Sequence, residues 1–233
     1  MKAILLAAGL GTRLKPLTDT MPKCLVPIKG KPLLAYWLEK LDALGVTEIL
    51  INLHYLSEKV AAFIATSPYK SKVTLIKEDK LLGTAGTLVA NKEFWQNEET
   101  LVIHADNFCM SDLQAFVKDH QKRINQTDAS LLLFETEQPS ACGIVKLNQD
   151  NVIVEFHEKV PNPPGKLASG ALFIFSPNVY SKYFQNLDNS VYRELSIDII
   201  PQMVDHLNGW QSDLPYLDIG TPEMLEKANN LPI

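Results

Sequence analysis

The chain has 233 residues, 46% of which are hydrophobic, and its 22 basic and 27 acidic side chains give a formal net charge of −5. This length suffices for one α/β domain with a sizeable core, and the mildly acidic balance disfavours nucleic acid as a partner. Every apolar run is shorter than the roughly 18 residues of a membrane-spanning helix, so we expect no membrane association.

Short apolar runs alternate with amphipathic stretches through the first two thirds of the sequence. The expected strands are Lys2–Ala7, Glu48–Asn52, Val73–Lys77, Thr100–Ala105 and Ala129–Phe134. The expected helices between them are Leu33–Leu44, Glu58–Ala65, Leu88–Phe94 and Asp112–Arg123. Continuous runs of Val, Ile and Leu are typical of strands covered on both faces, and the alternation indicates a doubly wound, mostly parallel, Rossmann-like sheet.

The last third of the sequence has a different pattern. Three strands follow one another closely, separated by turn residues, at Gly143–Leu147, Val152–Glu158 and Ala171–Phe175. Helical stretches are expected at Asn178–Asn186, Ile197–Leu207 and Pro222–Asn229. We therefore predict one α/β domain over residues 1–233, whose mixed sheet carries an antiparallel extension.

The cysteines indicate a reducing compartment. Cys24, Cys109 and Cys142 form no CxxC pair and are odd in number, which favours free thiols over a disulfide framework or a zinc site. The first apolar run, Ile4–Ala8, is too short for a signal-peptide core. We expect a cytoplasmic protein.

The loop after the first strand, Gly9–Thr18, is the most informative stretch. Its glycines let backbone N–H groups approach an anion, and Arg13, Lys15 and Lys23 can surround that anion with positive charge. A dinucleotide fingerprint would need a third glycine where Leu14 stands, and a P-loop would need Gly-Lys-Ser/Thr. The alternative is an ordinary turn between a strand and a helix.

This loop, together with the following Met21–Leu34, resembles the signature of sugar-phosphate nucleotidyltransferases, most of all the mannose-1-phosphate and heptose-1-phosphate guanylyltransferases. The resemblance extends over nearly the whole chain. It implies a Mg²⁺-dependent enzyme that transfers GMP from GTP to a mannose- or heptose-type sugar 1-phosphate and releases pyrophosphate. Uridylyl, thymidylyl or choline-phosphate cytidylyl transfer remains open, as does a non-catalytic nucleotide-sugar binding module.

Two aspartates stand where strands give way to loops. Asp106 follows the strand Thr100–Ala105, and Asp218 lies in another short apolar stretch, Tyr216–Pro222, before a helix. If both strands end at the same edge, the two carboxylates can share a hard cation; otherwise they cap turns. The resemblance implies that Asp106 and Asp218 coordinate Mg²⁺, although the family usually has glycine where this chain has Ala105.

Two further segments carry the substrate predictions. Leu81–Thr87 is a second glycine loop, which is either a helix N-cap around Thr84 or, as the resemblance implies, part of the base pocket; its Gly-Thr-Ala-Gly form is most like guanylyltransferases. Glu158-Lys159 resembles the family's Glu-Lys-Pro motif for the sugar and its phosphate, with Val160 in place of the proline. Ser169 stands where the family has asparagine, which puts the identity of the sugar in doubt.

The resemblance implies that residues 1–135 form the nucleotide-binding part of the domain. Residues 136–233, which include the antiparallel substrate-side extension, form the part that binds the sugar phosphate. The resemblance makes Arg13 and Lys23 catalytic. The residues predicted to bind the nucleotide are Leu6, Ala8, Gly9, Gly11, Thr12, Arg13, Lys23, Gly83, Thr84, Gly86 and Asp106. Those predicted to bind the sugar substrate are Asn107, Gly143, Glu158, Lys159, Ser169 and Asp218. A homo-oligomer is compatible with the sequence.

Overall fold

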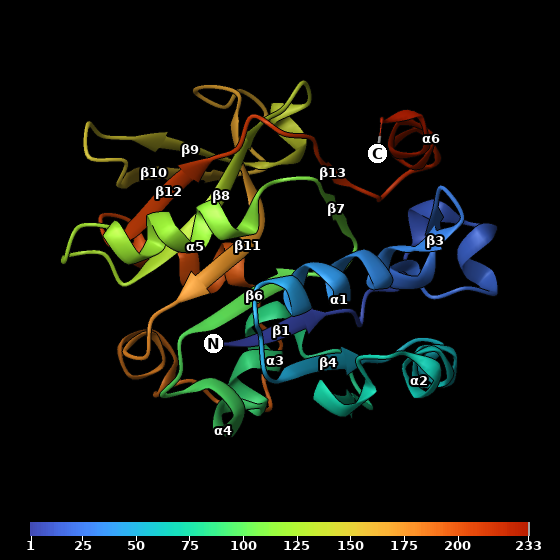
Figure 1. Cartoon of the computed structure of the whole chain (residues 1–233). Helices are drawn as coiled ribbons and strands as arrows, with labels where there is room; N and C mark the ends of the chain where they lie inside the picture. The colour runs from blue at the N-terminus through green and yellow to red at the C-terminus, as the bar shows by residue number, and fades with distance from the viewer. Residues whose placement is uncertain (233) are drawn as a thin grey trace. The chain divides into compact units, whose positions relative to one another are not determined.

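The chain forms two compact units whose segments interleave along the sequence, in a computed structural model that describes Met1–Pro232 (Figure 1). The first unit contains Met1–Leu81, Ile103–Met110 and the stretch that begins at Tyr216. The second contains Leu82–Val102 and Ser111–Pro215. Within Met1–Pro232 no helix is both long enough and apolar enough to cross a membrane.

A parallel sheet forms the centre of the first unit. Its strands are β1 (Lys2–Leu6), β4 (Ile49–Leu53) and β5 (Val73–Lys77), and the end of β6 (Thr100–His104) lies on the other side of β1. Figure 1 shows β1 and β4 side by side. In their parallel ladder Leu5 pairs with Ile51. All of β4 is buried. Its uninterrupted apolar sequence reflects cover on both faces, as predicted.

Two helices connect these strands. In α1 (Leu33–Ala43) the buried residues recur at helical spacing and include Trp37 and Leu41. The helix ends just before Gly45, which has φ +74° and therefore takes the left-handed conformation that often follows a helix C-terminus. The second helix, α2 (Ser57–Thr66), buries Val60 and Ile64. Both helices lie where the sequence predicted them.

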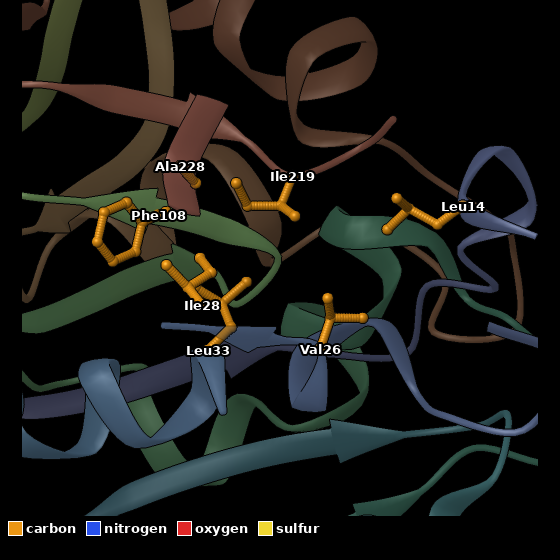
Figure 2. Close-up of a cluster of buried hydrophobic side chains, with 7 residues drawn as sticks. All are labelled: Leu14, Val26, Ile28, Leu33, Phe108, Ile219 and Ala228. Atoms are coloured by element: carbon orange, nitrogen blue, oxygen red, sulfur yellow. The ribbon is translucent and has the colours of Figure 1, made fainter. Parts of the chain in front are cut away.

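The rest of the first unit is held by a small apolar cluster. It joins two short antiparallel ladders, β2 (Pro27–Ile28) with β3 (Lys31–Pro32) and β7 (Asn107–Cys109) with β13 (Tyr216–Asp218), to α6 (Pro222–Asn230). The seven buried members drawn in Figure 2 are Leu14, Val26, Ile28, Leu33, Phe108, Ile219 and Ala228. Segments distant in sequence thus share one core.

The second unit contains most of the antiparallel pairing. Its strands, besides the start of β6, are β8 (Ala129–Glu135), β9 (Gly143–Leu147), β10 (Ile153–Glu158), β11 (Leu167–Phe175) and β12 (Leu207–Gln211). β9 pairs antiparallel with both β10 and β11, and β11 also pairs antiparallel with β8. The predicted fold class, a mostly parallel mixed sheet with an antiparallel extension, is confirmed.

One predicted helix of this unit, Ile197–Leu207, is wrong. The structure has a π-helical turn at Leu195–Ile199, a 3-10 turn at Ile200–Met203, and then β12, which runs parallel to β8. Pro201 explains the break, because proline lacks an N–H and its ring clashes with the preceding helical turn. Gly209 lets β12 pack closely, since a side chain there would lie 2.6 Å from Leu147.

The helices of the second unit also differ in their limits from the prediction. The expected helix Leu88–Phe94 is two helices, α3 (Gly83–Ala90) and α4 (Lys92–Trp95), so the second glycine segment is helical from Gly83 onward. The helix expected at Asn178–Asn186 is a π-helical turn over Tyr180–Phe184. The remaining helix, α5 (Leu113–Lys122), lies within the predicted Asp112–Arg123, and the Asp112 side chain caps its N-terminus.

Candidate active site

The loop after β1 is shaped by Gly11. This residue has φ +64°, and a side chain on it would lie 2.9 Å from Cγ2 of Thr18 and 3.2 Å from Cβ of Lys23. The hydroxyl of Thr18 donates a hydrogen bond to the Gly11 carbonyl (2.7 Å). Glycine is the residue that accepts both a left-handed backbone and so close a neighbour. The loop is therefore folded back on itself before the 3-10 turn Thr12–Leu14.

A cavity of about 290 Å³ opens beside this loop, within the first unit. Its lining consists of Gly9, Leu10, Gly11, Thr12, Arg13, Lys23, Asp106 and Gly220. The sequence predicted these residues as nucleotide contacts, except Leu10 and Gly220. Leu6 and Ala8, which were also predicted to contact the nucleotide, are buried at 8% exposure each and do not line this cavity.

Asp106 and Asp218 are brought together by the antiparallel pair β7 and β13. Asp218 lies opposite Asn107, the residue that follows Asp106. The backbone N–H of Ile219 then donates to the Asp106 carbonyl (3.1 Å). The two carboxylates therefore meet, which is the condition for sharing a cation. The antiparallel ladder of β7 with β13 aligns them.

The ammonium group of Lys23 lies between the two carboxylates. Its Nζ is 2.6 Å from Asp106 Oδ2 and 3.0 Å from Asp218 Oδ1. The Lys23 side chain is 8% exposed, whereas that of Asp218 is 54% exposed. Burial disfavours the ammonium ion, but the two carboxylates outweigh burial and raise the pKa of Lys23. Burial likewise disfavours the Asp106 carboxylate, but Lys23 outweighs it and lowers the pKa of Asp106.

Arg13 completes this group of charges. Its Nη2 lies 3.4 Å from Asp218 Oδ2, and its side chain is 66% exposed. Gly220 makes that approach feasible, because a side chain there would lie 2.7 Å from Arg13 Nη2 and 3.0 Å from Asp218 Oδ2. Gly220 belongs to the site, although no role for it was predicted from the sequence. A glycine two residues after Asp218 gives no indication that the Arg13 side chain packs over it.

The two carboxylates and two basic side chains of this site suit a divalent cation that is bound to a phosphate group. Lys23 and Arg13 are balanced by Asp106 and Asp218, so their formal charges cancel and offer a polyphosphate no net attraction. Two carboxylate oxygens that converge on one ammonium ion can also converge on Mg²⁺, which often takes one or two carboxylates and completes its shell with phosphate oxygens and water. Residues 1–232 contain no cluster of three or more His, Cys, Asp or Glu side chains able to hold a metal. Asp106 and Asp218 therefore fit a phosphate-bound Mg²⁺.

A buried polar pair supports the start of the glycine loop and was missed in the sequence. The side chain of Asn52, at 3% exposure, accepts from the Ala7 N–H (2.8 Å) and donates to Glu78 Oε1 (2.8 Å). Glu78 is 6% exposed and directly follows β5. The only signal in the sequence was a polar residue within an apolar strand. Asn52 connects the ends of three strands to the loop that lines the cavity.

Asn107, predicted to contact the sugar substrate, lies inside the protein. It is 6% exposed, its carbonyl accepts from Trp37 Nε1 (2.8 Å), and its amide donates to the Tyr216 hydroxyl (3.0 Å). These contacts tie β7 to α1 and β13. Their effect is to hold Asp106 and Asp218 in register.

Most of the residues predicted to bind sugar gather in the second unit. Gly143 pairs with Glu158 in the β9–β10 ladder, and a side chain on Gly143 would lie 2.7 Å from Glu158 Oε2. Lys159 follows with φ +48°, donates its N–H to the Cys142 carbonyl (3.0 Å), and places Nζ 3.3 Å from Glu158 Oε1. Ser169 lies within β11, next to the residue that pairs with β9.

The second glycine segment is the first turn of α3. Gly83 has φ +76° and begins the helix, and the side chain of Thr84 does not cap it. Instead, the Thr84 hydroxyl donates to Glu194 Oε2 (2.7 Å). Neither interpretation of this segment predicted Glu194 as the hydrogen-bond partner of Thr84, because the two residues are 110 positions apart in the sequence.

Comparisons with known proteins agree on the family. A family profile described as nucleotidyl transferase matches residues 2–232. A glucose-1-phosphate thymidylyltransferase from Streptomyces griseus is 31% identical over 77% of this chain and 50% of its own length. A mannose-1-phosphate guanyltransferase from Neurospora crassa is 32% identical over 96% of this chain and 62% of its own length. The chain thus spans about half to two thirds of these relatives.

A crystal structure of HddC from Yersinia pseudotuberculosis, complexed with GMP-PN, matches with a TM-score of 0.77 and 26% identity over 98% of this chain and 97% of that one. The family profile and the fold both match this chain over nearly its full length. This match agrees with the family resemblance of the glycine loop and of Asp106 and Asp218. The chain belongs to the nucleotidyl transferase family.

Proposed function

We propose that the chain is a sugar-1-phosphate nucleotidyltransferase that joins a nucleoside monophosphate to a sugar 1-phosphate and releases pyrophosphate. The observation that carries this proposal is the position of Lys23 between Asp106 and Asp218, with Arg13 beside them, on a glycine-loop cavity. Such a cluster handles phosphate charge and contains no nucleophile of its own. Transfer of a nucleoside monophosphate to a sugar phosphate requires neutralisation of phosphate charge and needs no nucleophile from the protein.

The nucleophile in this reaction is the sugar phosphate itself. One of its oxygens bonds to the α-phosphorus of the triphosphate, and the bond to the bridging oxygen breaks, so that pyrophosphate leaves with the electron pair. No base is needed, because the attacking phosphate is already an anion. What opposes the reaction is repulsion between two anions, and positioned cations reduce it.

Each residue of the cluster has a proposed role. The backbone of Gly9–Thr12 faces the phosphates, and Arg13 stabilises charge on the phosphate being transferred. Lys23 holds both carboxylates in place and adds positive charge. Asp106 and Asp218 would hold Mg²⁺, which when bound neutralises phosphate charge and aligns the two reactants.

We further propose GTP as the donor and a mannose- or heptose-configured 1-phosphate as the acceptor. The Gly83–Gly86 segment and the guanyltransferase relative support the guanylyl assignment. The thymidylyltransferase relative, which is about as similar to this chain, makes dTTP with glucose 1-phosphate the second candidate. In both cases residues 1–135 bind mainly the nucleotide and residues 136–233 bind mainly the sugar phosphate.

The three free thiols, Cys24, Cys109 and Cys142, support a cytoplasmic location.

The test is a matrix of GTP, dTTP, UTP, CTP and ATP against mannose, heptose and glucose 1-phosphates, with Mg²⁺ and with pyrophosphate release as the readout. We expect kcat/KM to be highest for GTP with mannose or heptose 1-phosphate. A tenfold or greater advantage of another triphosphate overturns the guanylyl assignment and leaves the reaction class intact. An absence of pyrophosphate release from every pair overturns the reaction class.

A further inference from the structure

The backbone of Val191–Arg193 lies directly against the two glycines of the segment proposed to contact the base. A side chain on Gly83 would lie 2.3 Å from the Arg193 carbonyl oxygen, and one on Gly86 would lie 3.2 Å from the Val191 carbonyl oxygen. The positive φ of Gly83 adds a second reason for glycine. These glycines are therefore required by packing within the second unit, irrespective of any ligand.

Backbone hydrogen bonds attach the same two segments to each other. The Arg193 N–H donates to the Leu82 carbonyl (2.9 Å), and the Arg193 carbonyl accepts from the N–H groups of Ala85 (3.0 Å) and Gly86 (3.3 Å). The first N–H groups of a helix have no partner within the helix. In α3 two of them are bound to a chain segment more than a hundred positions away in the sequence, so they are unavailable to a nucleotide.

Glu194 adds the side-chain half of this attachment. Its Oε2 accepts from the Thr84 hydroxyl (2.7 Å) and from the Thr84 N–H (3.3 Å), and its Oε1 accepts from the Tyr192 hydroxyl. The Thr84 oxygen in turn accepts from the Leu195 N–H (2.7 Å). A carboxylate at a helix N-terminus is also favoured by the helix dipole. The Glu194 side chain thus connects Thr84, in the first turn of α3, to Tyr192 on the opposing segment.

We propose that Glu194 is a positioning residue for nucleotide selection. By fixing Thr84 and the first turn of α3, it gives the base pocket one shape, so that discrimination between bases depends on Glu194 although it need not touch the nucleotide. This inference rests on the proposed function, in which Gly83–Gly86 contacts the base. A fixed pocket rejects the wrong base because its own polar groups then stay unpaired, whereas a loosened pocket adapts.

The test compares Glu194→Ala with Glu194→Gln, which retains an acceptor oxygen for Thr84, and with Glu137→Ala, an exposed control in the same unit. We expect Glu194→Ala to weaken GTP binding about tenfold and to reduce the ratio of kcat/KM between GTP and UTP by a similar factor, since Thr84 loses a partly buried, charged hydrogen-bond partner. The KM for mannose 1-phosphate should stay within about twofold, because Gly143 and Glu158 are untouched. Glu194→Gln should recover most of the loss.

Thr84→Val and Thr84→Ser form a second pair that leaves Glu194 in place. Valine should reproduce the loss of selectivity, and serine, which keeps the hydroxyl, should not. Wild-type affinity and base preference in Glu194→Ala, or equal losses for GTP and mannose 1-phosphate, would overturn the inference. GTP affinity is measured by calorimetry without sugar phosphate, so it remains interpretable even if the wild-type chain releases no pyrophosphate and the proposed function fails.

Discussion

At the scale of single residues, the position of Lys23 governs the chemistry of the site. A nearly buried ammonium ion is stable there because Asp106 and Asp218 both contact it, and the same contacts align the two carboxylates. Arg13 and Lys23 were singled out in the sequence because glycines and basic residues after a strand can surround an anion. Asp106 was singled out because it ends a strand and matches the metal-binding aspartate of the resembled family. Gly220 was not, because its role depends on a guanidinium from the other end of the chain.

Replacing Lys23 by methionine tests this position. The change keeps the length of the side chain but leaves Asp106 beside Asp218 without its cation. We expect the free energy of unfolding to fall by about 1–2 kcal/mol, a modest value because Asp218 is largely exposed. The expected loss in kcat is at least about 10²-fold, as for other positioned charges. Urea unfolding and pyrophosphate release measure the two effects, with the exposed Lys80→Met as control. Unchanged kcat in Lys23→Met would remove the residue from the proposed machinery.

Gly220→Ala separates the position of Arg13 from the stability of the fold. The added methyl group would collide with Arg13 Nη2, the mobile end of an exposed side chain, which can move aside. We therefore expect nearly unchanged thermal stability and a fall in kcat of about tenfold, because a displaced guanidinium loses its alignment. Gly165→Ala is the matched control, since a side chain there has no atom within 4 Å. A fall in melting temperature without a change in kcat would show that Gly220 serves folding alone.

At the scale of elements, the predicted bounds of strands and helices were most accurate where a single hydrophobic pattern extends over the whole segment. The strands β5 and β9 and the helix α1 agree with prediction to within one residue, because continuous apolar runs or helical spacing mark them clearly. A strand near Tyr216 was expected from the sequence, but its ladder with β7, which has three residues on each side, was not. A strand as short as β7 has too few residues to show a periodic pattern, and Phe108 anchors it in the apolar cluster.

That cluster can be tested through Phe108, which packs edge-on against Tyr36 at 5.2 Å between ring centroids and lies in the core drawn in Figure 2. Truncation to alanine removes a fully buried ring from β7, two residues after Asp106. We expect a loss of about 3–5 kcal/mol in the free energy of unfolding. Leu214→Ala, at a position 47% exposed, should cost little. A loss below about 1 kcal/mol for Phe108→Ala would mean that the cluster does not support β7.

At the scale of the whole molecule, the order of elements in the sequence does not reveal the two compact units. The first unit collects its segments from both ends and the middle of the chain. The family was nevertheless recognisable, because the glycine loop and its basic residues are contiguous. Lys23 and Asp218 are 195 positions apart, and only the folded chain accounts for their contact.

Stability should depend on pH through His120. Its side chain is fully buried, with Nδ1 2.8 Å from Ser130 Oγ and Nε2 3.5 Å from Glu99. Burial lowers the pKa of His120 below its ordinary value of 6.5, although Glu99 partly offsets this. The unfolded chain therefore binds the extra proton first, so the stability contributed by neutral His120 is complete above pH 6.5 and is lost as the pH falls through the folded pKa.

The measurement is the melting temperature between pH 7.5 and 5.5 for the wild type, His120→Gln and the exposed control His206→Gln. We expect the melting temperature of His120→Gln to vary less with pH than that of the wild type, even though the variant is less stable throughout. His206→Gln should follow the wild type. Parallel pH profiles for the wild type and His120→Gln would contradict the assignment.

Asp106 and Asp218 are proposed to form, with Lys23, the centre for nucleotidyl transfer. The most direct test is pyrophosphate release in the presence of Mg²⁺, with the most active pair of substrates, by the wild type, Asp106→Asn, Asp218→Asn and the exposed control Asp213→Asn. We predict that a chelator abolishes wild-type activity, that Asp213→Asn is unaffected, and that each of the other two variants folds normally but loses about 10³-fold in kcat, since metal charge stabilisation is worth several kcal/mol. Full activity in both Asp106→Asn and Asp218→Asn would contradict the account.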